Sequence, residues 1–179
     1  TYQRSGLYQV PLPYVLGLEG AGVVEAVGPK VSEFVVGDRV AWTSVPGSYA
    51  TYVNVAAVRA VKIPAKATTE NAAAVMLQGM TAHYLVHGIR EPKSTDVVLV
   101  HAAAGGTGLL LTQMLKRAGT RVIATCGSEA KAKLARQAGA DDVILYRDED
   151  FAAAVRRLTD GVGVDVVYDG VGQATFEGS

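Results

Sequence analysis

A glycine-rich segment in the middle of the chain has the residue types needed to hold a dinucleotide. It reads Ala103-Ala104-Gly105-Gly106-Thr107-Gly108 and follows the apolar residues Val98-Leu99-Val100. In the fingerprint G-x-G-x-x-G, the second glycine lets the backbone approach a pyrophosphate, and the third lets the following helix pack close to the strand. Gly105 and Gly108 occupy these two places, and Ala103 stands in the place of the first glycine, where alanine requires a negative φ. Glycines also end strands for purely structural reasons, but the strand–turn–helix context favours a phosphate loop with a helix N-terminus at the pyrophosphate.

The residues about twenty positions further on indicate which dinucleotide the loop would hold. NAD-binding folds place an acidic residue there for the ribose hydroxyls. This chain instead reads Thr125-Cys126-Gly127-Ser128, has its next carboxylate at Glu129, and places Lys131 one turn into the following helix. A carboxylate would repel a 2′-phosphate, whereas a hydroxyl and an ammonium group would bind it. We therefore predict NADPH as the cofactor; the alternative is that Lys131 only solvates an exposed helix face.

An alternation of apolar strands and helices is expected to position these residues. The predicted strands are Asp96–His101, Arg121–Cys126, Asp142–Leu145 and Val164–Asp169. The predicted helices are Gly106–Ala118, Glu129–Ala138 and Glu149–Leu158, with Ser128 as a cap and Gly119 and Gly139 as terminators. Strands and helices that alternate at this spacing predict an α/β fold, a doubly wound parallel sheet of the Rossmann type.

The N-terminal part of the chain shows a different pattern. Residues 15–64 are typical of β-structure, and Ser48–Val55 alternates as a strand would, directly after the turn signal Pro46-Gly47. Residues 69–90 are typical of a helix, which we expect to break at Gly79 and to end near Pro92. The pattern changes between residues 65 and 95 without a flexible linker.

Composition excludes several other kinds of function. The 179 residues include 17 basic and 17 acidic side chains, so no net charge attracts nucleic acid or an anionic membrane. Residues 97–115 carry no charge, but they divide into a strand, a small-residue turn and a buried helix face, and so do not indicate a membrane span. The single cysteine, Cys126, forms no intrachain disulfide and fits a reducing compartment. We therefore expect no nucleic-acid or membrane partner.

The order and spacing of many short motifs resemble one known family. The chain resembles the zinc-free quinone oxidoreductases (zeta-crystallin-like) of the medium-chain dehydrogenase/reductase superfamily. The motifs are Arg4-Ser5-Gly6-Leu7-Tyr8, Gly17-Leu18-Glu19-Gly20-Ala21-Gly22, Gly37-Asp38-Arg39-Val40, residues 47–52, Gly79-Met80-Thr81-Ala82, residues 103–113, Gly139-Ala140 and Tyr168-Asp169-Gly170-Val171-Gly172.

The resemblance implies a particular division of the chain. Residues 1–80 would be part of a GroES-like catalytic domain, and residues 81–179 part of a Rossmann NADPH-binding domain, with cofactor and substrate in the cleft between them. It also implies a longer protein, because family members have further β-structure before Thr1 and further strands after Ser179.

The resemblance also implies the absence of zinc. Zinc-dependent relatives have Gly-His-Glu where this chain has Gly17-Leu18-Glu19, and a four-cysteine lobe where it has a short loop. Glu19 is then expected to be a buried or hydrogen-bonded structural acid. His83 and His87 share a helix face, but a zinc site needs three or four ligands at about 2.0–2.3 Å, so we expect no metal.

The family's roles can be carried over onto matching residues of this sequence. The pyrophosphate would contact Gly105, Gly106, Thr107 and Gly108. The adenosine 2′-phosphate would be surrounded by Gly127, Ser128, Lys131 and Tyr146. Thr81 and Tyr2 would approach the nicotinamide, and Tyr2 is also the candidate catalytic contact with the substrate. For Tyr146 the alternative is a half-buried aromatic residue at the end of a strand.

The function implied is hydride transfer from NADPH to a quinone or another conjugated carbonyl compound without a metal. Catalysis would depend on proximity and a dry cleft, with a proton supplied by water or by the Tyr2 hydroxyl. An enoyl or enone reductase of the same superfamily would share every motif quoted, and an NADPH-binding structural protein without activity is the other alternative. The resemblance further implies a homodimer, and we expect a cytoplasmic location.

Overall fold

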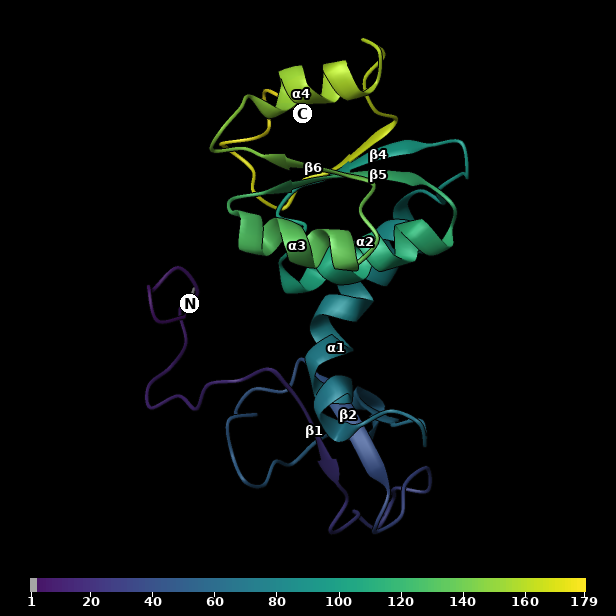
Figure 1. The fold of residues 1–179 in the computed structure, drawn as a ribbon. Coiled ribbons are helices and arrows are strands. Elements are labelled where there is room, and N and C mark those ends of the chain that lie inside the picture. The colour runs from purple at the N-terminus through teal and green to yellow at the C-terminus, as the bar shows by residue number, and fades with distance from the viewer. Residues whose placement is uncertain (1–2) are drawn as a thin grey trace. The chain divides into compact units, whose positions relative to one another are not determined.

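The computed structural model describes residues 3–179, which contain one antiparallel and one parallel sheet (Figure 1). Contacts between Cα atoms divide the chain into two compact units, Thr1–Leu77 and Gln78–Ser179. Tyr2, the candidate substrate contact, lies outside the described residues.

The first unit contains a small antiparallel sheet. Its strands are β1 (Glu19–Val23), β2 (Arg39–Thr43) and β3 (Ala60–Lys62), in the order β1-β2-β3, and a short 3-10 helix, η1 (Ala57–Arg59), precedes β3. Trp42 on β2 packs with Val40 and Val45 at the centre of a small core. A Cβ atom at Gly20 would lie 2.7 Å from the Trp42 ring, so the glycine makes room for the indole.

The prediction of a strand over Ser48–Val55 is wrong. The segment is irregular, and the Ser48 and Tyr49 amides donate to the backbone oxygens of Gly17 and Leu16 rather than to a strand ladder. Val53 and Val55 still pack against the Trp42 core. The alternation in the sequence therefore reflects one buried side of an irregular segment, because periodicity alone does not provide a neighbouring strand to pair with.

The prediction that the following helix breaks at Gly79 is also wrong. Helix α1 (Thr69–His83) continues through Gly79, and the departure from α-helical geometry comes later, in the π-helical segment η2 (Tyr84–Ile89). Glycine lowers helix stability without forbidding the conformation, and here the helix tolerates it. The Glu19 carboxylate accepts a hydrogen bond of 2.7 Å from the Leu77 amide, so Glu19 is a hydrogen-bonded acid, as expected, although it is only partly buried.

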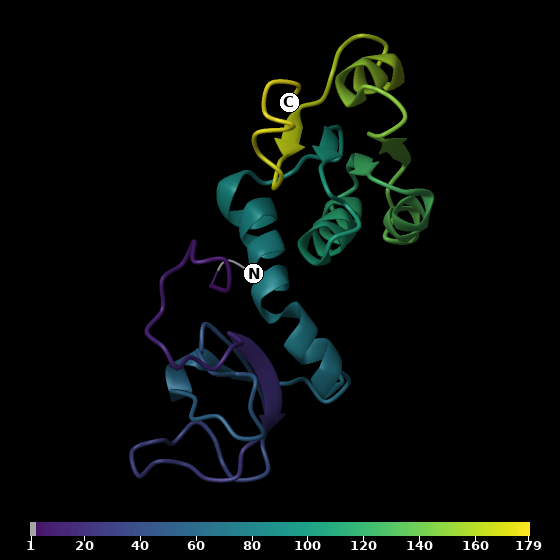
Figure 2. The ribbon, with the colours of Figure 1, turned by 90° about the vertical axis from the view of Figure 1, so that its left-hand side faces the viewer.

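The second unit has the predicted Rossmann-type architecture. The parallel strands β4 (Val97–Val100), β5 (Arg121–Cys126), β6 (Asp142–Leu145) and β7 (Val166–Tyr168) lie in the order β6-β5-β4-β7. Helices α2 (Gly106–Arg117) and α3 (Glu129–Gln137) cover one face of this sheet, and α4 (Phe151–Leu158) covers the other (Figures 1 and 2). This arrangement confirms the predicted α/β fold class.

Side chains that alternate along the strands fill two separate cores. Val98, Val100 and Val122 face α2 and α3, whereas Leu99 and Ile123 face α4. All five side chains are at most 2% exposed. Strands buried on both faces require continuous apolar runs, and this explains why the sequence signal was clear here.

The helix ends follow the expected capping residues. Gly119 and Gly139 have positive φ values of 87° and 108° after α2 and α3, and the Ser128 hydroxyl accepts a hydrogen bond from the Lys131 amide at 3.4 Å. The last helix starts at Phe151 rather than Glu149, because Asp150 is its N-cap and accepts from the Ala153 amide at 2.8 Å.

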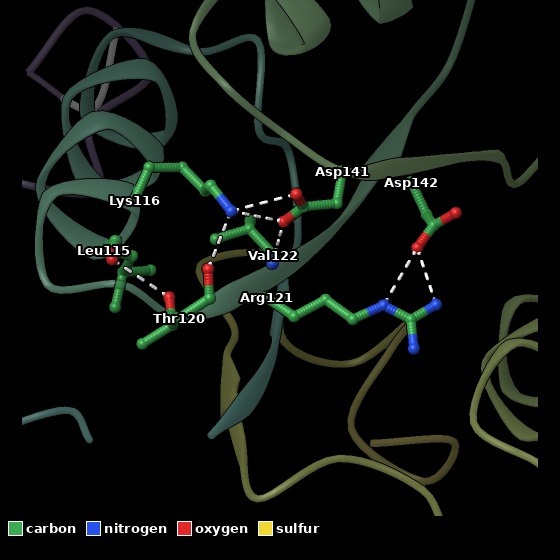
Figure 3. Close-up of polar contacts among 7 residues, drawn as sticks. All are labelled: Leu115, Lys116, Thr120, Arg121, Val122, Asp141 and Asp142. Carbon is green, nitrogen blue, oxygen red and sulfur yellow. Dashed lines mark hydrogen bonds and ion pairs between the residues drawn. The ribbon is translucent and has the colours of Figure 1, made fainter. Parts of the chain in front are cut away.

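A polar cluster fixes the amino ends of β5 and β6 (Figure 3). The Lys116 ammonium donates to both carboxylate oxygens of Asp141, at 2.7 and 2.9 Å, and to the Thr120 backbone oxygen at 2.8 Å. The Asp141 carboxylate also accepts from the Val122 amide at 2.7 Å. These contacts stabilise the amino end of the sheet.

Among residues 3–179, no helix has the length and hydropathy needed to cross a membrane.

Candidate functional site

A cavity of about 570 Å³ lies at the carboxyl ends of the parallel strands. In open α/β sheets, ligands bind at this edge, where the strand order reverses. The segments that follow all four strands of the second unit contribute to the wall, and each supplies at least one lining residue. The lining residues include His101, Gly105, Cys126, Tyr146, Phe151 and Thr175.

The phosphate loop has the close packing that its glycines require. A Cβ atom at Gly108 would lie 2.5 Å from the Ala102 backbone oxygen and 2.8 Å from Ala103 Cα. The positive φ of 49° is at Ala102, so Ala103 does not need a left-handed conformation. The Gly105 amide donates to the Ala102 oxygen at 2.9 Å, and Gly105 precedes the first turn of α2. The loop thus ends at a helix N-terminus that opens beside the cavity.

Three other residues predicted to contact the pyrophosphate or the nicotinamide, Gly106, Thr107 and Thr81, do not line the cavity. Gly106 and Thr107 lie in the first turn of α2, and the Gln78 side chain lies against the position that a Cβ atom of Gly106 would occupy. Thr81 is exposed on α1 and does not line the cavity.

Three of the predicted 2′-phosphate residues lie on the cavity wall. Gly127, Lys131 and Tyr146 line it, and the Tyr146 hydroxyl lies where a Cβ atom of Gly127 would stand. Tyr146 is 50% exposed, and its amide donates to the Cys126 oxygen at 3.2 Å, which joins the ends of β5 and β6. Ser128 is the adjacent helix cap. An exposed lysine and an exposed phenol therefore face one cavity.

Two acidic residues on the same wall have other partners. The Glu149 carboxylate pairs with Arg157 at 2.8 Å, and Asp150 caps α4. Neither of them stands at the end of β5, where a ribose-binding acid would be expected.

Sequence reasoning missed the residues on the floor of the cavity. His101 and Thr125 are 5% and 1% exposed, and their side chains are hydrogen-bonded to each other at 2.9 Å. Both residues stand at the carboxyl ends of predicted strands, and this position was a signal that could have identified them.

The Asp169 carboxylate stabilises the start of the turn after β7. Asp169 accepts hydrogen bonds from the amides of Val171 and Gly172, at 2.8 and 3.0 Å, and from the Thr175 hydroxyl at 2.7 Å. Burial raises the pKa of Asp169, but these hydrogen bonds outweigh burial and lower the pKa to about 2. The turn therefore depends on a charged carboxylate.

The depressed pKa of Asp169 predicts a dependence of stability on pH. The charged form stabilises the fold above its unfolded pKa, near 3.8, and this contribution is lost as pH falls toward about 2. In Asp169→Asn we expect a lower melting temperature at neutral pH and a smaller difference from the natural protein near pH 2. Melting curves of both proteins from acid to neutral pH test this, and a constant difference would contradict it.

Cys126 is expected to react slowly. Its thiol is 2% exposed at the end of β5, and burial raises its pKa. Because the thiolate is the reactive form, alkylation by iodoacetamide should be at least about tenfold slower in the native protein than in urea. Cys126→Ser, which has no cysteine, is the blank. Equal rates in native and unfolded protein would show that the thiol is accessible.

No group of three or more His, Cys, Asp or Glu side chains among residues 3–179 is arranged to hold a metal ion. The rings of His83 and His87 lie 4.6 Å apart, centroid to centroid.

Fold and site together define a dinucleotide-binding α/β protein, and known proteins show which kind. Residues 1–65 match the alcohol dehydrogenase GroES-like domain, and residues 106–179 match the zinc-binding dehydrogenase domain. The chain is 49% identical to a quinone oxidoreductase of Pseudomonas aeruginosa, in a match that covers 100% of this chain and 56% of that protein. It is 42% identical to a 2-haloacrylate reductase of Burkholderia, and this match covers 100% of this chain and 56% of that protein.

A solved structure agrees with these relatives. The Escherichia coli quinone oxidoreductase complexed with NADPH superimposes with a TM-score of 0.95 at 44% identity, over 99% of this chain and 55% of that one. The chain belongs to the zinc-free quinone oxidoreductase family of the medium-chain dehydrogenase/reductase superfamily. It spans about half the length of the curated relatives it matches.

Proposed function

We propose that the cavity of the second unit binds the adenosine and pyrophosphate portions of NADPH. The observation that carries this proposal is the wall formed by Gly127, Lys131 and Tyr146, with no acid at the end of β5. The Lys131 ammonium and the Tyr146 hydroxyl can bind a phosphate dianion, and the N-terminus of α2 can accept the pyrophosphate through Gly105, Gly106, Thr107 and Gly108. The Ser128 hydroxyl accepts from the Lys131 amide and still has its own proton to donate to a phosphate oxygen.

The whole protein is proposed to reduce quinones or other conjugated carbonyl compounds. Bound NADPH would supply the hydride, and this chain would bind and orient the cofactor. We assign residues 1–80 to a GroES-like catalytic domain and residues 81–179 to the NADPH-binding domain. Thr81 is proposed near the nicotinamide, and Tyr2 as the contact with the substrate. The quinone oxidoreductase names of the relatives support this activity.

A second candidate is reduction of an activated carbon–carbon double bond. The resemblance to a 2-haloacrylate reductase supports it, since such a substrate is also a conjugated acceptor. Steady-state oxidation of NADPH and NADH by the full-length protein, with a panel of quinones and enones, separates the candidates. We expect quinone-dependent oxidation that is faster with NADPH. Faster turnover of enones would favour the second candidate, and tight NADPH binding without any turnover would favour a non-catalytic role.

We further propose a homodimer in the cytoplasm. The family resemblance supports the dimer, and the single buried Cys126 fits a reducing compartment. Light scattering of the full-length protein at micromolar concentration tests the dimer, and a monomeric mass would contradict it.

A further inference from the structure

A buried histidine on the floor of the cavity uses both ring nitrogens. His101 follows β4 and is 5% exposed. Its Nδ1 lies 2.9 Å from the Thr125 hydroxyl on β5, and its Nε2 lies 3.2 Å from the Ser179 hydroxyl. The ring also meets the Phe151 ring edge to face, with centroids 4.7 Å apart. One side chain thus contacts β5, α4 and the segment after β7.

The hydroxyl partners determine where the imidazole carries its proton. The Ser179 hydroxyl donates to the Thr175 backbone oxygen at 2.7 Å and also lies 3.4 Å from an Asp169 carboxylate oxygen. Both of these oxygens only accept, so the single proton of Ser179 is already used and its oxygen must accept from His101 Nε2–H. Nδ1 is then unprotonated and accepts from the Thr125 hydroxyl.

The surroundings keep this ring neutral. Burial lowers the pKa of His101, and the Asp169 carboxylate opposes that effect without overcoming it. The side chains that contact the ring, from Thr125, Phe151 and Ser179, carry no charge. A neutral imidazole with one donor and one acceptor therefore matches both partners.

The segment that His101 holds forms part of the cavity wall. Val171, Ala174 and Thr175 line the cavity and belong to the turn after β7. The Asp169 carboxylate, directly after β7, binds the start of this turn, and the Thr175 and Phe176 amides donate to the Gly172 oxygen, so these bonds keep the turn folded near β7 but do not reach its last residue, Ser179. The His101–Ser179 hydrogen bond connects the end of this turn to β4.

We propose that His101 is a positioning residue that fixes the wall formed by residues 171–175 and so sets the affinity of the cavity for the adenosine portion of the dinucleotide. The inference rests on the proposed function, since it takes NADPH as the ligand. Within residues 3–179, the hydrogen bonds of the His101 ring go to Thr125 and Ser179 and not to the residues predicted to bind the 2′-phosphate. Its effect should therefore be the same for NADPH and NADH, which distinguishes it from the effect of Lys131.

Two substitutions of matched chemistry test this role in the full-length protein. His101→Asn keeps an amide oxygen near the place of Nδ1 for Thr125 but is too short to reach Ser179. His101→Gln puts an amide nitrogen near the place of Nε2 and keeps a donor for Ser179. Both remove the imidazole and its contact with Phe151, so a purely structural role predicts the same loss in both.

We expect His101→Asn and Ser179→Ala to weaken NADPH and NADH binding alike, about three- to tenfold, which corresponds to one net hydrogen bond. His101→Gln should stay within about twofold of the natural protein. Fluorescence titration gives the dissociation constants. Melting temperatures of the unliganded proteins show whether the His101→Asn and His101→Gln variants are equally well folded.

The outcomes separate this inference from the proposed function. Binding of neither cofactor by the natural protein would overturn the proposed function itself. Tight NADPH binding that is unchanged in His101→Asn, or equally weakened in Asn and Gln, would overturn only the role of His101. Long-range proton–nitrogen spectra of the ¹⁵N-histidine-labelled protein give a second measurement. An Nδ1–H tautomer or a charged ring at neutral pH would also overturn it.

Discussion

NADPH should bind the Lys131→Ala variant about ten to a hundred times more weakly than the natural protein. A charge-assisted hydrogen bond to a phosphate contributes about 1.5–3 kcal/mol, and each 1.4 kcal/mol corresponds to about one decade in Kd. NADH binding should hardly change, because NADH has no 2′-phosphate to lose. Dissociation constants of both cofactors, measured by titration of the full-length protein, give the result directly.

Lys133→Ala is the matched control for this prediction. Lys133 is an exposed lysine on the same helix, α3, but it does not line the cavity. The control removes the same charge from the helix while leaving the wall intact, so it should bind NADPH almost as well as the natural protein. If Lys131→Ala weakens both cofactors equally, Lys131 does not read the phosphate. A natural protein that prefers NADH would refute the NADPH assignment as a whole.

Gly108→Ala should reduce both stability and cofactor binding. Its Cβ atom would lie 2.5 Å from the Ala102 oxygen and 2.9 Å from the Ala103 carbonyl carbon, and backbone atoms cannot move aside without shifting the loop. Overpacking of this kind costs about 1–3 kcal/mol, more than the gain of about 1 kcal/mol from replacing glycine by alanine in a helix. The same shift moves the N-terminus of α2, so NADPH binding should weaken at least about tenfold.

Gly28→Ala is the control for the glycine substitution. Gly28 has no positive φ, and the nearest atom to an added Cβ would be a Val31 methyl carbon at 3.9 Å, an ordinary contact. Urea unfolding and NADPH titration should therefore show a deficit in Gly108→Ala that Gly28→Ala lacks. If Gly108→Ala unfolds at the same urea concentration as the natural protein, α2 can move away from β4 without penalty and the packing argument fails.

The parallel sheet and the phosphate loop were predictable because their causes are local. Val98-Leu99-Val100 is buried on both faces, so it reads as an unbroken apolar run, and the caps Ser128, Gly119 and Gly139 mark the helix ends directly. The antiparallel unit was less predictable. At Ser48–Val55 the alternation is real, but whether an alternating segment joins a sheet depends on a neighbouring strand that no local pattern specifies.

The sequence by itself determined the kind of ligand site. The glycine spacing, the absence of an acid directly after Thr125 and the presence of Lys131 can all be read directly from it. Only the tertiary structure decided which other residues share that site. His101, Thr125 and Ser179 are up to 78 positions apart, and they meet because parallel strands bring their carboxyl ends to one edge. A hydrogen bond between such distant residues follows from the order of the strands in the sheet, and local sequence patterns carry no information about that order.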